Sequence, residues 1–283
     1  MSNIQWYPGH MAKTVRLIKE DVKLIDVVIE LLDARVPLSS KNPEIDDLSM
    51  QKKHIYVLNK SDLSGAQANN YWKNYYEQTG SPVLLCNAQN GHGAEQIVET
   101  SRLLMREKIE SQKKRGRIFM PIRAMIVGIP NVGKSTLINR FVSKAITKVG
   151  DKPGVTKAKQ WVKIKKDFEL LDTPGLLWPK FENREIGINL AITGAINEQI
   201  LDANELCYQF IKKLLLIDKN ALNTRYHIDF DNAQNPNEII QKIGSSRGFK
   251  TPGGGVDTER TSIMILDEFR AGKLGKICLD SMA

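Results

Sequence analysis

The feature that most constrains this chain is the sequence GIPNVGKST, Gly128 to Thr136, which directly follows the apolar run AMIV. It matches GxxxxGK(S/T) in full, in the order of strand, glycine-rich loop and helix that phosphate binding requires. In such a loop the backbone amides converge on phosphate oxygens, and the lysine, here Lys134, reaches the β- and γ-phosphates. The residues predicted to bind the phosphates are Asn131, Val132, Gly133, Lys134, Ser135 and Thr136.

Three further positions complete a predicted magnesium site with this loop. The hydroxyl of Ser135 can ligate Mg²⁺ directly. Asp172, in the sequence DTPG after the apolar run FELL, can hold the ion through a water, and the amide of Gly175 can sense the γ-phosphate. Thr156, about 20 residues after Ser135 and 16 before Asp172, is predicted to ligate the same ion and to order its loop only when a γ-phosphate is bound.

The choice of base depends on an earlier tetrapeptide, Asn59-Lys60-Ser61-Asp62, which follows the apolar run HIYVL. The carboxylate of Asp62 can accept hydrogen bonds from N1-H and the 2-amino group of guanine, whereas adenine has a donor at neither place. Leaving such an acceptor unpaired costs several kcal/mol, which predicts strong selection of guanine. Asn59 is expected to brace the pocket, and Lys60 to lie along the base and ribose.

A second guanine contact is predicted at Asn87-Ala88, which follows the apolar run VLL. There the backbone amide of Ala88 can donate a hydrogen bond to guanine O6. Together these motifs predict a protein that binds GTP and GDP and hydrolyses GTP with Mg²⁺.

Short apolar runs alternate with helical patterns, which favours an α/β fold with a mainly parallel sheet. The predicted strands are residues 26–32, 54–58, 83–85, 124–127 and 168–171. After about residue 180 the spacing becomes helical, over residues 185–199, 202–217, 237–243 and 258–271. We therefore predict a nucleotide-binding domain over residues 1–178 and a small all-helical C-terminal domain over residues 179–283.

The order of the motifs is unusual. Most GTPases place the phosphate loop before the guanine-reading motif, whereas here the guanine-reading Asn59 to Asp62 comes first. This order predicts a circularly permuted P-loop GTPase domain. A permutation is tolerated when the original termini lie close enough to be joined, and residues 90–123, a charged helix running into a strand, are the predicted joint.

Composition narrows the possible partners. The net charge is +9, with 28 basic and 18 acidic residues in residues 1–178 but 13 and 14 in the rest. The basic segments 102–123 and 144–166 fit two interpretations, a solvated face or a surface that contacts a nucleic-acid backbone. No apolar stretch approaches the roughly 18 residues of a membrane span, so we expect no membrane partner and a cytoplasmic location. Cys86, Cys207 and Cys278 are too few for a disulfide framework and are expected to be buried and reduced.

The permuted motif set occurs with WYPGHMAK at residues 6–13 and DARVP at residues 33–37. Over essentially the whole chain, this combination resembles the YlqF-like family of ribosome biogenesis GTPase A. The resemblance implies a monomeric cytoplasmic GTPase that binds the maturing large (50S) ribosomal subunit and is stimulated by it. It also implies that the C-terminal domain helps to contact ribosomal RNA. One departure is Asn87, where the family often has serine; the backbone contact of Ala88 is unaffected.

The resemblance also bears on catalysis. Many GTPases have a glutamine after the DxxG glycine to orient the attacking water, but here that position is Leu176. The family implies that His10 takes this role, so His10, Lys134 and Thr156 are the predicted catalytic residues. The alternative is that His10 only packs or caps a turn. A further hypothesis from the family is that Asn131 holds K⁺ beside the phosphates. A switch that acts on the small subunit or on a protein partner is the alternative function.

Overall fold

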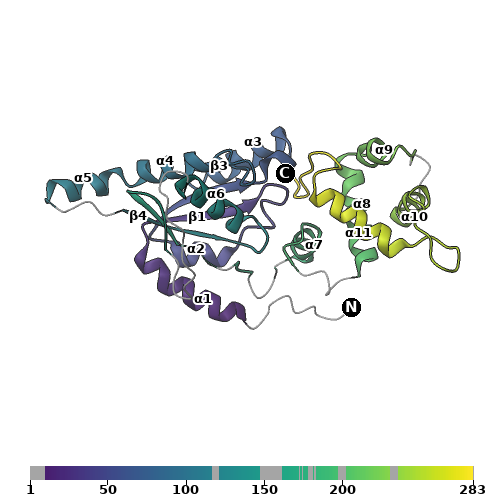
Figure 1. Ribbon diagram of the computed structural model, residues 1–283, viewed down its shortest axis with the longest axis horizontal. Helices are drawn as coiled ribbons and strands as arrows, with labels where there is room; N and C mark the ends of the chain where they lie inside the picture. Colours follow the sequence, from purple (N-terminus) through teal and green to yellow (C-terminus); the bar gives the residue numbers. More distant parts are fainter. Residues whose placement is uncertain are drawn as a thin grey trace.

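The computed structural model describes residues 10–116, 121–146, 161–171, 173, 175–177, 181, 183–196, 202–229 and 235–282 (Figure 1). Within these ranges the side chains of residues 10–14 and 144–146 are not described. Of the predicted site residues, Thr156 and Asp172 lie outside the described residues. His10 is the first residue of helix α1, but its side chain is outside the described part.

The sheet has six strands in the order β3-β2-β1-β4-β6-β5. Their bounds are β1 Val27–Asp33, β2 Lys53–Asn59, β3 Val83–Leu85, β4 Ile122–Gly128, β5 Trp161–Lys165 and β6 Phe168–Leu171. Every neighbouring pair is parallel except β5 and β6. The five predicted strands and the mainly parallel sheet are thus confirmed. Strand β5 was not predicted, because its sequence WVKIK places lysines between apolar residues at the edge of the sheet.

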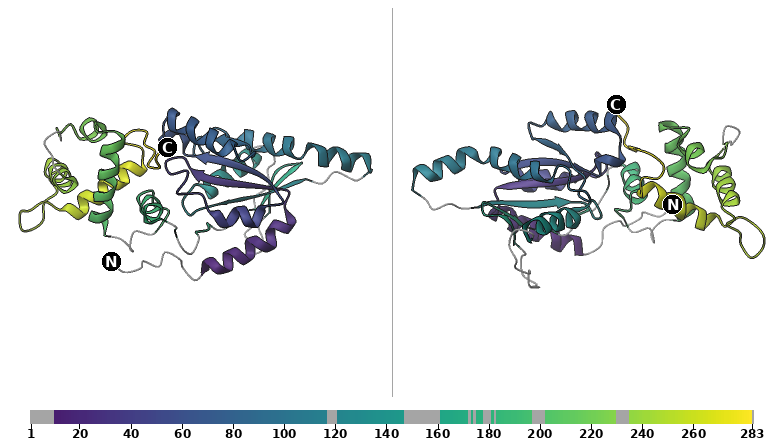
Figure 2. Two further views of the ribbon diagram at one scale, coloured as in Figure 1. Left: turned by 180° about the vertical axis from the view of Figure 1, so that it is seen from behind. Right: turned by 45° about the horizontal axis from the view of Figure 1, so that its top comes forward.

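The central strands are apolar because both faces of the sheet are covered. All seven residues of β1 are buried. Figure 1 shows helices α1 (His10–Asp21) and α2 (Pro43–Ser49) below the sheet, with α4 (Ala94–Leu104) and α6 (Lys134–Ile146) above it. Helix α3 (Ala66–Glu77) packs Trp72 and Tyr76 with Tyr56 and Leu58 of β2, and α5 (Arg106–Lys114) continues from α4. All strands except β5 run with their carboxyl ends toward the remaining helices (Figure 2).

The later part of the described chain is helical (Figure 2). Its helices pack around an apolar core that also includes Val36 from the loop after β1. Its helices are α7 Arg184–Ile192, α8 Ala203–Ile217, α9 Ala221–Tyr226, α10 Pro236–Ser246 and α11 Thr258–Arg270. The rings of Phe210 and Phe269 lie 4.7 Å apart at the centre of this core. The prediction of a helix over residues 185–199 was wrong at its end: α7 stops at Ile192, because Gly194 takes a positive φ of 78° and closes the turn. Helix α9 was not predicted.

Four of these helices begin at a side-chain cap. Asn183, Asp202, Asn235 and Asp257 each accept a hydrogen bond from a backbone amide in the first turn of the helix that follows. Such a cap satisfies an amide that has no partner within the helix, and typically stabilises by about 1 kcal/mol. These local signals explain why the helix starts could be placed from the sequence.

The C-terminal residues run from α11 back to the sheet. The amide of Ile277 donates to the carbonyl of Leu63 at 2.8 Å, and the amide of Leu279 donates to the carbonyl of Arg35 at 2.7 Å. The buried carboxylate of Asp280 accepts from the amide and hydroxyl of Ser39 at 2.9 and 2.5 Å. The helical part is therefore fastened to the loop after β1 and to the turn after β2.

All three cysteines are buried free thiols, as predicted, and burial raises the pKa of Cys86 to about 12. Within the described residues, no helix is long and apolar enough to cross a bilayer. Several cations of the segment 102–123 form ion pairs, including Arg102 with Asp167 and Lys108 with Asp26. Most of the segment 144–166 lies outside the described residues.

Candidate nucleotide site

The predicted nucleotide-binding motifs meet at one edge of the sheet. Strand β2 ends at Asn59, β3 ends just before Cys86, and β4 ends at Gly128. Because these strands are parallel, their carboxyl ends share an edge, which is where ligands bind in open α/β sheets. The base-reading and phosphate loops, far apart in sequence, therefore lie side by side.

Asn59 connects three of the predicted elements directly. Its Nδ2 donates to the carbonyl of Val132 in the phosphate loop at 2.7 Å. Its Oδ1 accepts from the amide of Ala88 at 3.0 Å. The side chain is almost fully buried, at 2% exposure. Both ends of one amide are thus used to brace the phosphate loop against the two predicted base-reading loops.

Gly133 is required for this contact. A Cβ at Gly133 would lie 2.3 Å from Nδ2 of Asn59, and the backbone φ of +106° is one that other residues rarely adopt. The second glycine of the motif therefore allows the close approach of the two loops.

Lys60 forms a second connection. It has a left-handed backbone conformation, with φ of 59°. Its Nζ donates to the carbonyl of Asn131 at 2.9 Å and to the carboxylate of Asp33 at 2.9 Å. The ammonium group thus bridges the phosphate loop and the end of β1, while its stem is available to lie beside a base.

Asp33 and Arg35 form an ion pair that supports Lys60, and this role was not assigned from the sequence. Arg35 donates to both oxygens of Asp33, at 2.9 and 2.7 Å, and both side chains are almost fully buried. Burial opposes the charge of Asp33, but Lys60 and Arg35 outweigh it and hold the pKa of Asp33 well below its usual value. The Arg35 guanidinium also lies 5.3 Å from the ring centre of Phe269 in α11. The sequence feature that could have indicated this role is the charged DxR motif at the end of an apolar strand.

The remaining residues predicted to read guanine differ in exposure. The amide and hydroxyl of Ser61 donate to the carbonyl of Cys86, at 3.1 and 3.0 Å, which aligns the two base-reading loops. Asp62 lies in the short 3-10 turn Ser61–Leu63 and is exposed, so its carboxylate is open to a ligand. Asn87 accepts from the amides of residues 89 and 90 and so shapes its own turn. The amide of Ala88, predicted to contact guanine O6, here donates to Asn59.

In the predicted phosphate loop Lys134 is buried, whereas the next two residues are exposed. Nζ of Lys134 donates to the carbonyls of Gly128 and Ile129, at 3.0 and 2.7 Å, across the loop. Ser135 and Thr136 are exposed on the first turn of α6, where backbone amides lack helical partners. The side-chain Nδ2 of Asn131 donates to the carbonyl of Gly194 after α7 at 2.7 Å, which ties the loop to the helical part.

Gly175 packs against the phosphate loop. A Cβ there would lie 2.9 Å from Pro130 and 3.1 Å from Nζ of Lys134. The next residue, Leu176, donates its amide to the carbonyl of Gly128 at 3.1 Å, and its side chain is fully buried in the core. A buried aliphatic side chain cannot orient water, so any water-positioning group must come from elsewhere in the chain or from a partner.

Known GTPases match this chain in sequence. Residues 123–236 match a family model described as "50S ribosome-binding GTPase". The chain is 45% identical over 278 residues to ribosome biogenesis GTPase A of Bacillus cereus, covering 98% of this chain and 94% of that protein. It is 46% identical over 279 residues to the protein of the same name from Priestia megaterium, covering 98% and 96%.

Two solved structures of YlqF from Thermotoga maritima show the same fold. The GDP-bound structure has a TM-score of 0.67 at 22% identity, covering 94% of this chain and 98% of that one. The GNP-bound structure has a TM-score of 0.65 at 23% identity, covering 95% and 98%.

The buried ion pair below Lys60 gives a stability prediction. Asp33→Asn leaves the Arg35 guanidinium buried without its carboxylate, so we expect a loss of about 3 to 5 kcal/mol in the free energy of unfolding. The pKa of Asp33 is depressed on folding, so its contribution is complete above about pH 5 and is lost progressively as the pH falls further. Urea denaturation of wild type and variant should show a constant difference from pH 7 to about 5 that narrows below it.

The control is Asp47→Asn, which removes an exposed carboxylate from α2 and should change stability by no more than about 0.5 kcal/mol. Equal stability of the Asp33 and Asp47 variants would contradict a supporting role for the pair.

Proposed function

Since the chain belongs to the ribosome biogenesis GTPase A family and folds as a circularly permuted P-loop GTPase, we propose that it hydrolyses GTP on the maturing large (50S) ribosomal subunit and is stimulated by that subunit. The observation that carries the proposal is the pair of hydrogen bonds in which Asn59 donates to Val132 and accepts from Ala88. They support a single site in which the proposed base-reading and phosphate-binding loops act together. The family model's description, "50S ribosome-binding GTPase", supports the choice of subunit.

In this proposal Asp62 reads N1-H and the 2-amino group of guanine, and Lys60 lies along the base. Guanine O6 shares the Ala88 amide with Asn59 or takes it over. Amides of the phosphate loop and Nζ of Lys134 bind the phosphates. The exposed hydroxyl of Ser135 suits a hard cation that prefers oxygen ligands, so Ser135 would hold Mg²⁺ with Thr156 and Asp172. The ion neutralises charge that develops on the phosphates.

The buried position of Leu176 supports a role for His10 in orienting the attacking water. We propose that His10, near the start of the chain, enters the site when the ribosomal subunit is bound. We also propose that Asn131 holds a potassium ion beside the phosphates. Its side-chain oxygen would bind the ion, because its side-chain nitrogen donates to the carbonyl of Gly194.

The helical part, residues 179–283, is proposed as a second domain that contacts ribosomal RNA in the cytoplasm. The division from residues 1–178 is supported by the apolar core of its helices, to which Val36 is the one contributor among the buried residues described before 179. Its near balance of 13 basic and 14 acidic residues favours recognition by shape over attraction by charge alone. We propose that the protein is a monomer in solution.

Sedimentation with ribosomal fractions tests the proposed function. With a non-hydrolysable GTP analogue we expect the protein to migrate with large subunits, and with GDP to remain at the top of the gradient. Migration with small subunits would favour the alternative assembly role. Migration with neither subunit in either state would favour a protein partner and contradict the proposal.

The base-reading carboxylate gives a sharper test of the site. Asp62→Asn should weaken GTP binding by roughly 100-fold, because the amide cannot accept from both guanine donors. The same variant should gain affinity for xanthosine triphosphate, whose carbonyl at C2 can accept from the new amide. Nucleotide titrations by fluorescence would measure both changes, with Asp47→Asn as the control. Unchanged GTP affinity in the Asp62 variant would reject this site.

His10 can be tested separately from nucleotide binding. His10→Ala should leave GTP affinity unchanged and reduce the subunit-stimulated rate of hydrolysis by about 100-fold or more, as loss of a general base does. The control is His227→Asn, which changes an exposed histidine of the helical part. Equal stimulation of wild type and the His10 variant would remove His10 from the mechanism.

A further inference from the structure

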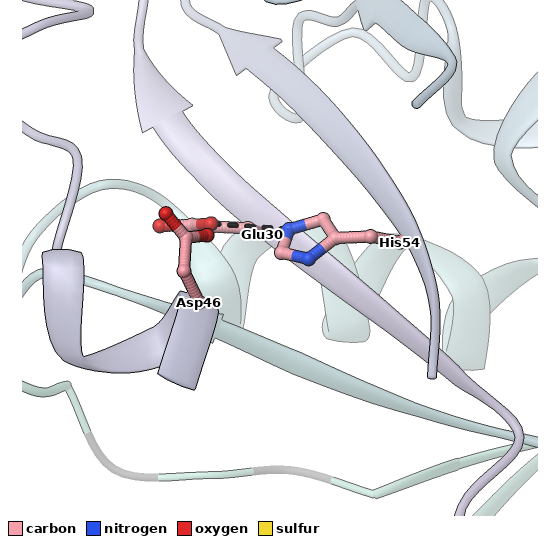
Figure 3. A group of neighbouring side chains, drawn as sticks. All are labelled: Glu30, Asp46 and His54. Atoms are coloured by element: carbon pink, nitrogen blue, oxygen red, sulfur yellow. Dashed lines mark hydrogen bonds and ion pairs between the residues drawn. The ribbon is translucent and has the colours of Figure 1, made fainter. Parts of the chain in front are cut away.

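A group of metal-ligating side chains lies away from the nucleotide motifs, between the sheet and α2. Glu30 of β1, His54 of β2 and Asp46 of α2 each offer a ligand atom, and these atoms lie within 4.8 Å of one another (Figure 3). In Figure 3 the imidazole of His54 and the carboxylate of Asp46 both point toward the carboxylate of Glu30. The ring Nε2 of His54 is 3.1 Å from Oε2 of Glu30.

Glu30 is the unusual member of this group. Its side chain is completely buried, in the middle of a strand whose other residues are almost all apolar. Its Oε2 contacts His54 and Lys41, but Oε1 has no hydrogen-bond partner among the described residues. A buried carboxylate oxygen without a partner is costly, so it marks a place where a cation would gain most.

A cation is already held there by the chain itself. Nζ of Lys41 lies 3.2 Å from Oε2 of Glu30 and 2.6 Å from Oδ1 of Asp46. The ammonium therefore occupies the position between the two carboxylates that a metal ion would take.

The surroundings also suit a metal-bound histidine. Such a histidine usually has its second ring nitrogen near an oxygen that fixes the ring, and Nδ1 of His54 lies 3.5 Å from the hydroxyl of Ser49. The Asp46 side chain is 53% exposed, so it can rotate inward to shorten its distance to the other ligands. The same exposure leaves a path from solvent.

We propose that Glu30, Asp46 and His54 form a binding site for a divalent transition metal ion such as Zn²⁺. The metal ion would compete with the ammonium of Lys41 for this position. One imidazole and two carboxylates at bond lengths of about 2.0 to 2.2 Å, with water as the fourth ligand, match the coordination that Zn²⁺ takes. Mg²⁺ is a poor competitor because it prefers an all-oxygen octahedral shell. The site is thereby distinct from the magnesium position proposed at Ser135.

Cobalt is a suitable probe, because Co²⁺ replaces Zn²⁺ and absorbs visible light strongly in a tetrahedral site. We expect the full chain, with GDP and excess Mg²⁺, to bind one Co²⁺ with such bands and to release it when Zn²⁺ is added. His54→Gln should abolish the bands. The matched control His92→Gln, which changes an exposed histidine, should keep them. Absence of the bands in wild type, or their persistence in the His54 variant, would overturn the proposal.

Lys41 offers a variant that a purely structural network would not explain. Lys41→Gln removes the competing ammonium and should tighten Co²⁺ binding by roughly tenfold, because two carboxylates then lack a cation. Without metal the variant should melt at a lower temperature than wild type, and Zn²⁺ should restore the loss. A Lys41 variant that melts lower and is neither tightened for Co²⁺ nor rescued by Zn²⁺ would show that the group serves packing alone. None of these measurements depends on GTP hydrolysis, so a negative result for the metal site leaves the proposed function untouched.

Discussion

The site depends on one buried amide that is used at both ends. Asn59 donates to the phosphate loop through Val132 and accepts from the loop of Ala88, with almost no exposure to solvent. A carboxylate in the same place could not donate, and an aliphatic residue would leave a buried carbonyl and a buried amide without partners. Since these contacts join loops at the carboxyl ends of parallel strands β2, β3 and β4, they are independent of the order in which the chain visits the strands. This is why a permuted chain can keep the site.

A network of buried charges supports the contacts of Asn59. Lys60 spans from the phosphate loop to Asp33, and Arg35 closes the network against the ring of Phe269. Such a network is costly to bury, so its value lies in geometry: each charge has only one arrangement in which it is paired. The helical part takes part directly, through Phe269 and through the carbonyl of Gly194 that accepts from Asn131. The nucleotide loops and the helices are consequently held as one structure.

The sequence was sufficient where the signal is local. Buried parallel strands such as β1 read as continuous apolar runs, and the glycine-rich loop needs its residues at set positions. The edge strand β5 was missed because lysines interrupt its apolar residues, and α7 was predicted too long because the turn at Gly194 was not recognised. The roles of Asp33 and Arg35, and the cluster around Glu30, depend on side chains from different elements meeting in space, which no local pattern encodes.

The hydrogen bonds of the C-terminal segment have a consequence for the timing of folding. Ile277 and Leu279 bind the carbonyls of Leu63 and Arg35, which lie more than 200 residues earlier in the chain. Contacts of such long sequence separation form late in folding, after the local helices and turns. The support that Ile277 gives to the turn carrying Asp62 is therefore added late, and until then that turn depends on the hydrogen bonds from Ser61 to Cys86.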